Sequence, residues 1–280
     1  MNAPLKLPPI GVFDSGVGGL TVLRALRAAL PAEDFIYLGD TARLPYGTKS
    51  AESVIRYSLQ CAAVLAARGI RCLVVACNTA SASSLGALRR QYPSLPVIGV
   101  IEPGAAAAVA TSSTQHIAVI ATEGTIHGGA YEAAIRRLNG SARVVSCACS
   151  LFVALAEEGW TSGPIAEGIA RRYLEPIFCA DDGPDTLVLG CTHFPVLRAS
   201  ICAALPPGVK LVDSAVTTAA AVLRQLHAAA QAPSIEATRD SNHRGSIAWL
   251  ATDGAARFAH VGSIFLGETL SAEQIEIVDL

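Results

Sequence analysis

One pattern occurs twice in this chain of 280 residues: a short apolar run ends at a cysteine, and residues suited to the start of a helix follow it. The first copy is RCLVVACNTASASS at residues 71–84, and the second is DTLVLGCTHFP at residues 185–195. Short runs rich in valine and leucine are typical of buried strands. Because ligands of open α/β sheets bind beyond the carboxyl ends of the strands, Cys77 and Cys191 are expected where a reactive thiol would lie.

Two further motifs, each at the end of an expected strand, also repeat in the same order along the chain. This repetition predicts an α/β fold made of two pseudo-symmetric lobes, each a mainly parallel sheet flanked by helices, with the active site in the cleft between them. We expect the first lobe to comprise residues 1–97 plus 212–280 and the second lobe residues 98–211. The repeated pairs are residues 10–16 (IGVFDSG) with 117–124 (IAVIATEG), and residues 97–104 (VIGVIEPG) with 210–215 (KLVDSA).

Composition narrows the class of protein. Hydrophobic residues make up 51% and charged residues 16% of the chain, which is enough to build a sizeable core. The net charge of −2 gives no broad basic field, so no nucleic-acid partner is expected. No apolar run approaches the roughly 20 residues of a membrane span, so no membrane partner is expected. The segment 1–9 is too short and too interrupted by proline for a signal peptide, which favours a cytoplasmic protein with reduced thiols.

The cysteines and lysines bear on cofactors. The eight cysteines include no CxxC pair, so we predict no structural zinc site and no metal in the active site. The lysines are Lys6, Lys49 and Lys210, and none lies in the repeated motifs, which argues against a Schiff-base cofactor. We therefore expect chemistry without a cofactor.

Two thiols that face each other suit racemisation in particular. This reaction removes a proton from one face of Cα and returns one to the other face, so it needs one thiolate as base and one thiol as acid. Asp14, at a neighbouring strand end, and His193, two residues beyond Cys191, are placed to assist. For either cysteine alone, a buried structural role is the more common explanation, and Asp14 alone could be a helix N-cap.

The substrate class follows from what the motifs lack. The stretches 11–23, 72–85 and 186–197 contain no Lys or Arg. Anionic substrate groups would then be held by backbone N–H groups and small polar side chains, which favours a small amino acid over a phosphate. The small polar side chains available in these stretches are Ser15, Asn78, Thr79 and Thr192.

Four stretches resemble glutamate racemase of the bacterial aspartate/glutamate racemase superfamily: DSGVGGL at 14–20, LPYG at 44–47, ACNTA at 76–80 and GCTHFP at 190–195. Two stretches near the C-terminal end, ATDG at 251–254 and FLG at 265–267, are also similar to that family. The resemblance implies a cofactor-independent enzyme that interconverts L- and D-glutamate and supplies D-glutamate for peptidoglycan. It also leads us to expect a homodimer.

The resemblance assigns roles to individual residues. Cys77 would handle the proton on the D-glutamate side and Cys191 the proton on the L-glutamate side, assisted by Asp14 and His193. Glu157 matches an acid that lies one layer behind the substrate; adjacent to Glu158, it is equally well explained as part of a solvated helix face. The positions that match substrate contacts are Asp14, Ser15, Pro45, Tyr46, Gly47, Cys77, Asn78, Thr79, Thr125, Cys191 and Thr192.

The sequence departs from the family in the segment before Glu157. Residues 149–155 read CSLFVAL, where the family often has prolines at the second and sixth positions. Some members also carry an N-terminal extension linked to activation by a cell-wall precursor; because only about ten residues precede Gly11, we expect no such activation.

Three alternatives remain at this stage. A racemase for another acidic amino acid, chiefly aspartate, would share most motifs, although the Pro45–Gly47 stretch favours glutamate. A thiol hydrolase would use one cysteine and one histidine and would leave the second cysteine unexplained. A non-catalytic binding protein of the same fold would keep the cleft without needing both thiols.

Overall fold

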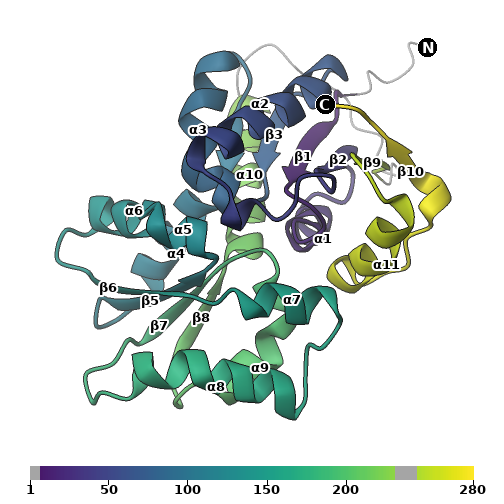
Figure 1. Ribbon diagram of the computed structural model, residues 1–280. Helices are drawn as coiled ribbons and strands as arrows, with labels where there is room; N and C mark the ends of the chain where they lie inside the picture. The colour runs from purple at the N-terminus through teal and green to yellow at the C-terminus, as the bar shows by residue number, and fades with distance from the viewer. Residues whose placement is uncertain (1–6, 231–244) are drawn as a thin grey trace.

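The computed structural model describes residues 7–230 and 245–280, and these form two parallel sheets flanked by helices (Figure 1). The first sheet has six strands in the order β10-β9-β2-β1-β3-β4, and the second has four in the order β6-β5-β7-β8. The strands are β1 (Ile10–Asp14), β2 (Phe35–Gly39), β3 (Cys72–Val75), β4 (Val97–Gly99), β5 (His116–Ala121), β6 (Arg143–Ala148), β7 (Thr186–Gly190), β8 (Lys210–Asp213), β9 (Ile247–Ala251) and β10 (Ile275–Ile277).

The helices cover the faces of these sheets. They are α1 (Leu20–Ala29), α2 (Ala51–Ala67), α3 (Asn78–Gln91), α4 (Ile101–Thr111), α5 (Glu123–His127), α6 (Ala130–Leu138), α7 (Leu151–Glu157), α8 (Pro164–Phe178), α9 (Arg198–Ala203), α10 (Ser214–Ala230) and α11 (Ala255–Leu266), with the short 3-10 helices η1 (Tyr46–Thr48), η2 (Phe194–Leu197) and η3 (Ala272–Gln274).

The strand order confirms the duplication that the sequence predicts. Strands β2-β1-β3-β4 of the first sheet and β6-β5-β7-β8 of the second repeat one arrangement, and β9 and β10 extend the first sheet at the β2 edge. The chain leaves the first sheet after β4 and returns to it after β8. The division into residues 1–97 plus 212–280 and residues 98–211 stays a prediction.

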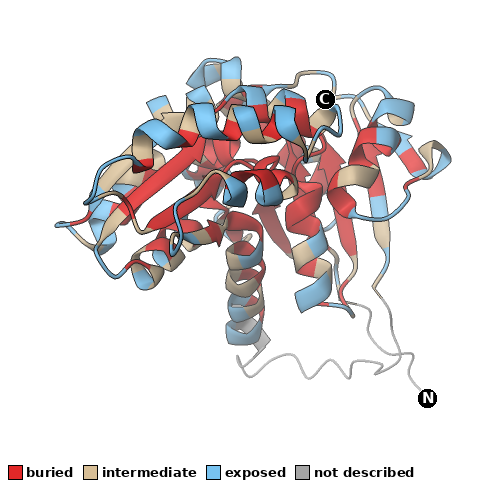
Figure 2. Ribbon diagram, turned by 90° about the horizontal axis from the view of Figure 1, so that it is seen from below, coloured by how far each residue is buried: buried red, intermediate tan, exposed pale blue. Residues whose placement is uncertain are grey.

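Burial of the central strands explains their apolar sequences. All residues of β1, β2, β3 and β7 are buried, because helices cover both faces of each sheet (Figure 2). In the first sheet Phe13 is in register with Val75, and in the second Ala121 is in register with Gly190. Neighbouring strands therefore end at the same level, and the residues that follow them lie side by side.

Helix α10 joins the two halves. The sequence pattern predicts a helix over residues 217–230 that returns to the first half. The helix that follows β8 does return there, where it packs against α1 and also contacts α4 (Figure 1). Its buried face includes Ala219, Val222 and Leu226. Burying one aliphatic side chain of this kind contributes about 1.5–3 kcal/mol, so this face fixes the two sheets relative to each other.

Two sequence expectations need correction or lie outside the described residues. The sequence pattern predicts one helix over residues 194–205, whereas the structure divides this segment into the 3-10 helix η2 and the helix α9. Helices α4 and α6 and strand β10 were not expected from the sequence. The polar composition of residues 231–245 predicts a loop, and this segment lies almost entirely within residues 231–244, which the structure does not describe.

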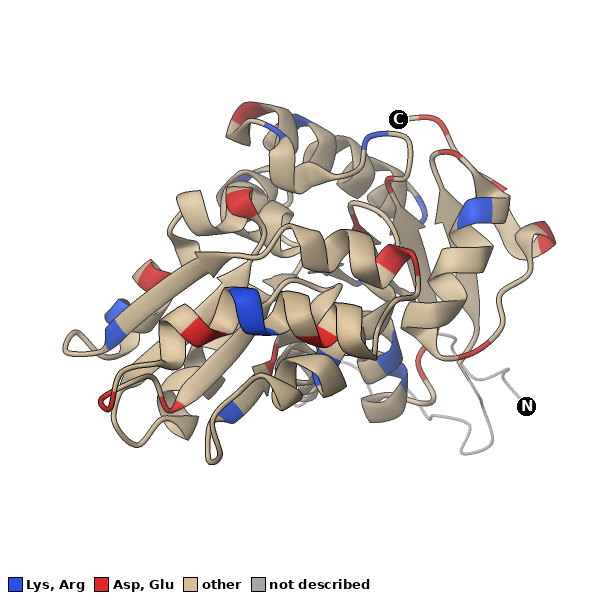
Figure 3. Ribbon diagram, turned by 60° about the horizontal axis from the view of Figure 1, so that its bottom comes forward, with Lys and Arg blue, Asp and Glu red and all other residues tan. Residues whose placement is uncertain are grey.

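Charged side chains of both signs are interspersed on the outer helices and loops of both halves (Figure 3). Among residues 7–230 and 245–280, no helix is both long and apolar enough to cross a bilayer.

Candidate active site

Cys77 lies at the junction of β3 and α3. It is the N-cap of α3, and its Sγ accepts a hydrogen bond from the N–H of Ala80 at 3.4 Å. The same sulfur donates to Ser15 Oγ at 3.5 Å, which links it to the turn after β1. Burial, reinforced by the negative charge of Asp14, raises the pKa of Cys77 to about 12. In this environment Cys77 holds its proton and is suited to act as an acid.

Cys191 follows β7 and has a different partner. Its Sγ lies 3.8 Å from Nδ1 of His193, whose Nε2 lies 3.2 Å from Oε1 of Glu157. Burial alone would lower the pKa of His193, but the hydrogen bonds to Cys191 and Glu157 outweigh it and raise the pKa to about 10. His193 is therefore an imidazolium near neutral pH, and it offers a positive charge to an anion that develops on the Cys191 sulfur.

Glu157 completes this chain of contacts from α7. Its hydrogen bond to His193, together with a contact of 3.3 Å to Arg257 from α11, lowers the pKa of its carboxyl group. The neighbouring Glu158 is exposed. The two glutamates therefore differ in role: Glu157 faces the site, and only Glu158 lies on a solvated face.

The two thiols lie on opposite halves of the molecule, yet within range of each other's charge. A negative charge on Cys191 is one of the causes that raise the pKa of Cys77. Each thiol also has its own titratable neighbour, Asp14 for Cys77 and His193 for Cys191. Asp14 and His193 also act on each other: the charge of His193 lowers the pKa of Asp14, and the charge of Asp14 raises the pKa of His193.

Two buried polar atoms near the thiols have no hydrogen-bond partner among the described residues: Oδ1 of Asp14 and Nδ2 of Asn78. The other oxygen of Asp14 accepts from the N–H of Gly16 at 3.0 Å, and burial raises the pKa of this carboxyl. An unpaired buried polar atom costs about 1–3 kcal/mol. One acceptor and one donor are thus available together for a ligand that carries a cationic and an anionic group.

Threonine hydroxyls join the two halves beside the thiols. Thr79 Oγ1, from α3, lies 3.0 Å from Thr122 Oγ1 and 3.2 Å from Thr125 Oγ1, both from the second half. Thr21, from α1, donates to the carbonyl oxygen of Thr192 at 3.0 Å. These contacts hold the strand ends of one sheet against those of the other.

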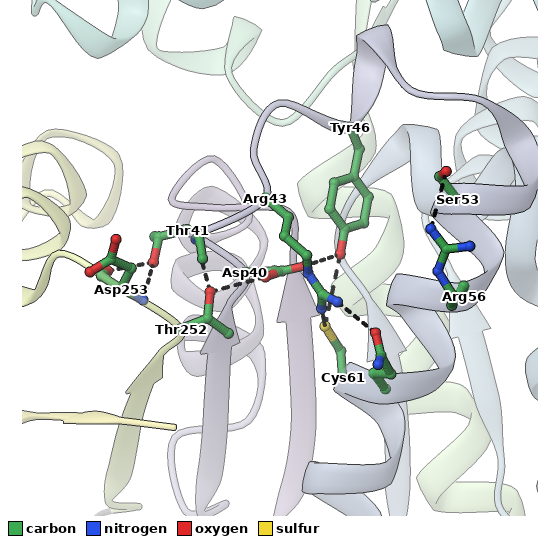
Figure 4. A network of polar contacts seen from close by, with 11 residues as sticks. Asp40, Thr41, Arg43, Tyr46, Ser53, Arg56, Cys61, Thr252 and Asp253 are labelled. Atoms are coloured by element: carbon green, nitrogen blue, oxygen red, sulfur yellow. Dashed lines mark hydrogen bonds and ion pairs between the residues drawn. The ribbon is translucent and has the colours of Figure 1, made fainter. Parts of the chain in front are cut away.

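The loop after β2 is anchored from beneath by a buried carboxylate (Figure 4). Asp40 accepts from Nε of Arg43 at 2.7 Å, from Oγ1 of Thr252 at 2.9 Å and from the hydroxyl of Tyr46. The Tyr46 side chain is thereby directed into the first half. A Cβ at Gly47 would lie 2.9 Å from Thr122 Cβ, so the backbone of this loop lies directly against the second half.

Gly18 makes the close approach of the two motifs possible. A Cβ at Gly18 would lie 2.4 Å from Nδ1 of His193 and 2.5 Å from Oγ1 of Thr192. A side chain there would therefore displace the imidazole that supports Cys191. A cavity of about 260 Å³ adjoins the outer side of this arrangement, lined in part by Val17, Glu157 and Arg257.

The structure thus brings the predicted cysteines, Asp14, Ser15, His193, Glu157 and the Asn78, Thr79, Thr125 and Thr192 side chains into one connected region between the sheets. Pro45, by contrast, is exposed, and its peptide bond to Leu44 is cis. No group of three or more metal-ligating side chains occurs within the described parts of the chain.

Comparison with known proteins agrees with this geometry. Residues 10–242 match the family described as Asp/Glu/Hydantoin racemase. A curated protein named glutamate racemase from Geobacter metallireducens is 52% identical over 261 residues, which cover 93% of each chain. The chain belongs to the Asp/Glu/hydantoin racemase family.

Solved structures of this family superpose closely. Glutamate racemase from Francisella tularensis, solved in complex with D-glutamate, matches with a TM-score of 0.87 and 35% identity, and the match covers 98% of both chains. Glutamate racemase from Thermus thermophilus, solved in complex with β-chloro-D-alanine, matches with a TM-score of 0.83 and 41% identity over 98% of this chain and 97% of that one. The fold of this family member is therefore that of solved glutamate racemases.

Sequence reasoning did not find every residue of this region. Tyr131, Thr122, Thr21 and Asp40 all form buried or half-buried hydrogen bonds here. Thr122 occupies the position in the second strand-end motif that Asp14 occupies in the first, so the repeat could have identified it. Tyr131 lies on α6, a helix the sequence did not reveal, so nothing marked it.

Proposed function

We propose that this protein is a glutamate racemase that uses its two thiols, and no cofactor, to interconvert L- and D-glutamate. The observation that carries the proposal is the placement of Cys77 and Cys191 on opposite sheets, each with its own acid–base neighbour. The curated relatives and the solved neighbours named above are glutamate racemases, and the first of those structures contains D-glutamate.

The reaction starts with L-glutamate between the two sulfurs. Cys191, as thiolate beside the His193 imidazolium, removes the Cα proton, and the electron pair stays on the carbanion. Cys77, as thiol, donates its proton to the opposite face of Cα and becomes the thiolate, which gives D-glutamate. The reverse reaction exchanges the roles of the two sulfurs.

The buried polar atoms bind the amino-acid core. The Oδ1 of Asp14 accepts from the substrate ammonium group, and the Nδ2 of Asn78 donates to its α-carboxylate. Further donors for the carboxylates are the hydroxyls of Thr79, Thr125 and Thr192 and the backbone N–H groups within the Pro45–Gly47 segment. Aspartate is one methylene shorter, a difference worth about 1–3 kcal/mol in a fitted site.

The wider role follows from the product. D-Glutamate made by this enzyme supplies peptidoglycan synthesis. We expect the reaction to take place in the cytoplasm and the enzyme to be a homodimer. Size-exclusion chromatography with light scattering tests the dimer.

The test of function is a set of three serine variants followed by circular dichroism of L-glutamate. Cys77→Ser and Cys191→Ser each should lose at least about 10³-fold in kcat/KM, because a hydroxyl is far harder to ionise than a thiol. Cys202→Ser, at an exposed cysteine, is the matched control and should retain full activity. Turnover that survives either of the first two changes would exclude two-thiol racemisation, and turnover of L-aspartate in preference to L-glutamate would exclude the assigned substrate.

A further inference from the structure

Tyr131 of α6 connects the second half of the molecule to the residue that follows Cys77. Its side chain is buried, and its hydroxyl donates a hydrogen bond to Oδ1 of Asn78 at 2.8 Å. Asn78 is the first residue of α3 and is itself buried. The bond therefore spans the two halves immediately beside the first thiol.

This bond determines which way the Asn78 amide faces. The oxygen and nitrogen of a carboxamide diverge from one carbon, so a partner that holds the oxygen also fixes the direction of the two N–H donors. Because Tyr131 holds Oδ1, the Nδ2 group points away from α6, and it is buried without a partner among the described residues. The two N–H donors of Asn78, the residue after Cys77, are therefore left for a ligand, and the proposed function assigns them to the α-carboxylate.

Two glycines make room for the tyrosine. A Cβ at Gly104 of α4 would lie 3.2 Å from the Tyr131 hydroxyl, and a Cβ at Gly190 would lie 3.0 Å from its ring atom Cε2. Gly190 directly precedes Cys191. The ring thus packs against the backbone that carries one thiol, while the hydroxyl holds the residue next to the other.

The hydroxyl keeps its proton throughout. Burial raises the pKa of Tyr131, and the negative charge at Cys191 adds to the effect, although Ser214 within hydrogen-bonding reach opposes it. Tyr131 therefore serves as a fixed hydrogen-bond donor and not as an acid or base in the reaction.

We propose that Tyr131 is a positioning residue, which orients the Asn78 amide toward the α-carboxylate of the amino-acid substrate and so sets the affinity of the site. The inference rests on the proposed function. It adds that binding of the substrate carboxylate beside Cys77 depends on Tyr131, whose ring packs against the residue before Cys191.

Tyr131→Phe tests this assignment, since it keeps the ring and removes only the hydroxyl. A hydrogen bond of this kind is worth a factor of about 3–10 in binding. KM for both L- and D-glutamate should rise by about that factor while kcat stays within about twofold, the signature of lost binding that ground and transition states share. Tyr92→Phe, the same change just beyond the far end of α3, is the matched control and should leave both constants unchanged.

A double-variant cycle separates positioning from packing. If Tyr131 acts through Asn78, Tyr131→Phe should add nothing once Asn78→Ala has removed the amide, so the double variant should match Asn78→Ala alone. Gly104→Ala is a second route, because its Cβ would lie 3.2 Å from the hydroxyl and push it by a few tenths of an ångström without removing it, so KM should also rise slightly. Thermal unfolding of each variant checks that the fold is kept.

The outcomes are distinct. An inactive wild-type protein would refute the proposed function itself. An active wild type whose KM is unchanged by both Tyr131→Phe and Gly104→Ala would refute the role of Tyr131. Effects of Tyr131→Phe and Asn78→Ala that multiply in the double variant would also refute it, because they would show that the two side chains act independently.

Discussion

Replacing Glu157 by glutamine should weaken the charge that supports Cys191. The structure gives the scale: the pKa of His193 is raised to about 10 from its ordinary value of 6.5. This pKa difference of about 3.5 corresponds to roughly 5 kcal/mol in favour of the imidazolium. It is the net effect of Cys191, Glu157 and Asp14, which favour the charged ring, and of burial, which opposes it. Glutamine keeps the shape of Glu157 but not its charge, so we expect the free energy of unfolding to fall by about 1–2 kcal/mol.

The pH dependence of that loss follows from the sign of the pKa change. Because the pKa of His193 is higher in the folded than in the unfolded protein, its contribution to the free energy of unfolding is complete below pH 6.5 and disappears as pH rises through about 10. Glu157→Gln should therefore reduce the free energy of unfolding most near pH 6.5. The difference from wild type should shrink steadily toward pH 10.

Urea denaturation at several pH values measures this difference, and Glu158→Gln is the matched control because Glu158 is exposed. In kinetic assays Glu157→Gln should lower kcat/KM about tenfold, equivalent to about 1.4 kcal/mol. The two directions should fall equally, because enantiomers have equal free energies and the equilibrium constant stays at one. A stability difference that grew with pH, or an equal effect of Glu158→Gln, would refute the assignment of Glu157.

Three further predictions concern the site. Asp14→Asn should raise the free energy of unfolding at pH 7, since burial raises the pKa of Asp14 and so disfavours its ionised form above pH 3.8. Turnover should fall at least about 100-fold, and urea denaturation with kinetics checks both. Gly18→Ala should lower kcat/KM about 100-fold with an unchanged far-ultraviolet spectrum, because its Cβ would displace His193. Prolonged dialysis against EDTA should leave activity intact, and the protein should show no pyridoxal absorbance; activity restored only by added metal would contradict cofactor-independent chemistry.

The sequence predicted those features that repeat. The order of motifs around Asp14, Cys77, Thr122 and Cys191 was enough to predict two similar parallel sheets. The matching order of β2-β1-β3-β4 and β6-β5-β7-β8 confirms this prediction. The reason is physical: parallel strands are buried on both faces and read as apolar runs, and their carboxyl ends carry the polar residues.

Contacts between the two halves could not be predicted in the same way. The bond from Tyr131 to Asn78 joins residues 53 positions apart, and it depends on the space left by Gly104 and Gly190. Helices α4 and α6 also lacked a clear sequence signal: α4 is rich in alanine, and α6 is short. The different roles of Glu157 and Glu158 were likewise open until the fold showed which one faces His193.

Proton exchange during turnover tests the two-thiol mechanism most directly. L-Glutamate is incubated with the purified protein in D₂O without added cofactor, and the product is followed by circular dichroism and proton NMR. If one sulfur removes the Cα proton and the other delivers a solvent-derived one, the D-glutamate formed early in the reaction should carry deuterium at Cα. D-Glutamate that retained the original Cα hydrogen would contradict the account, because the hydrogen would then have moved directly from one face to the other.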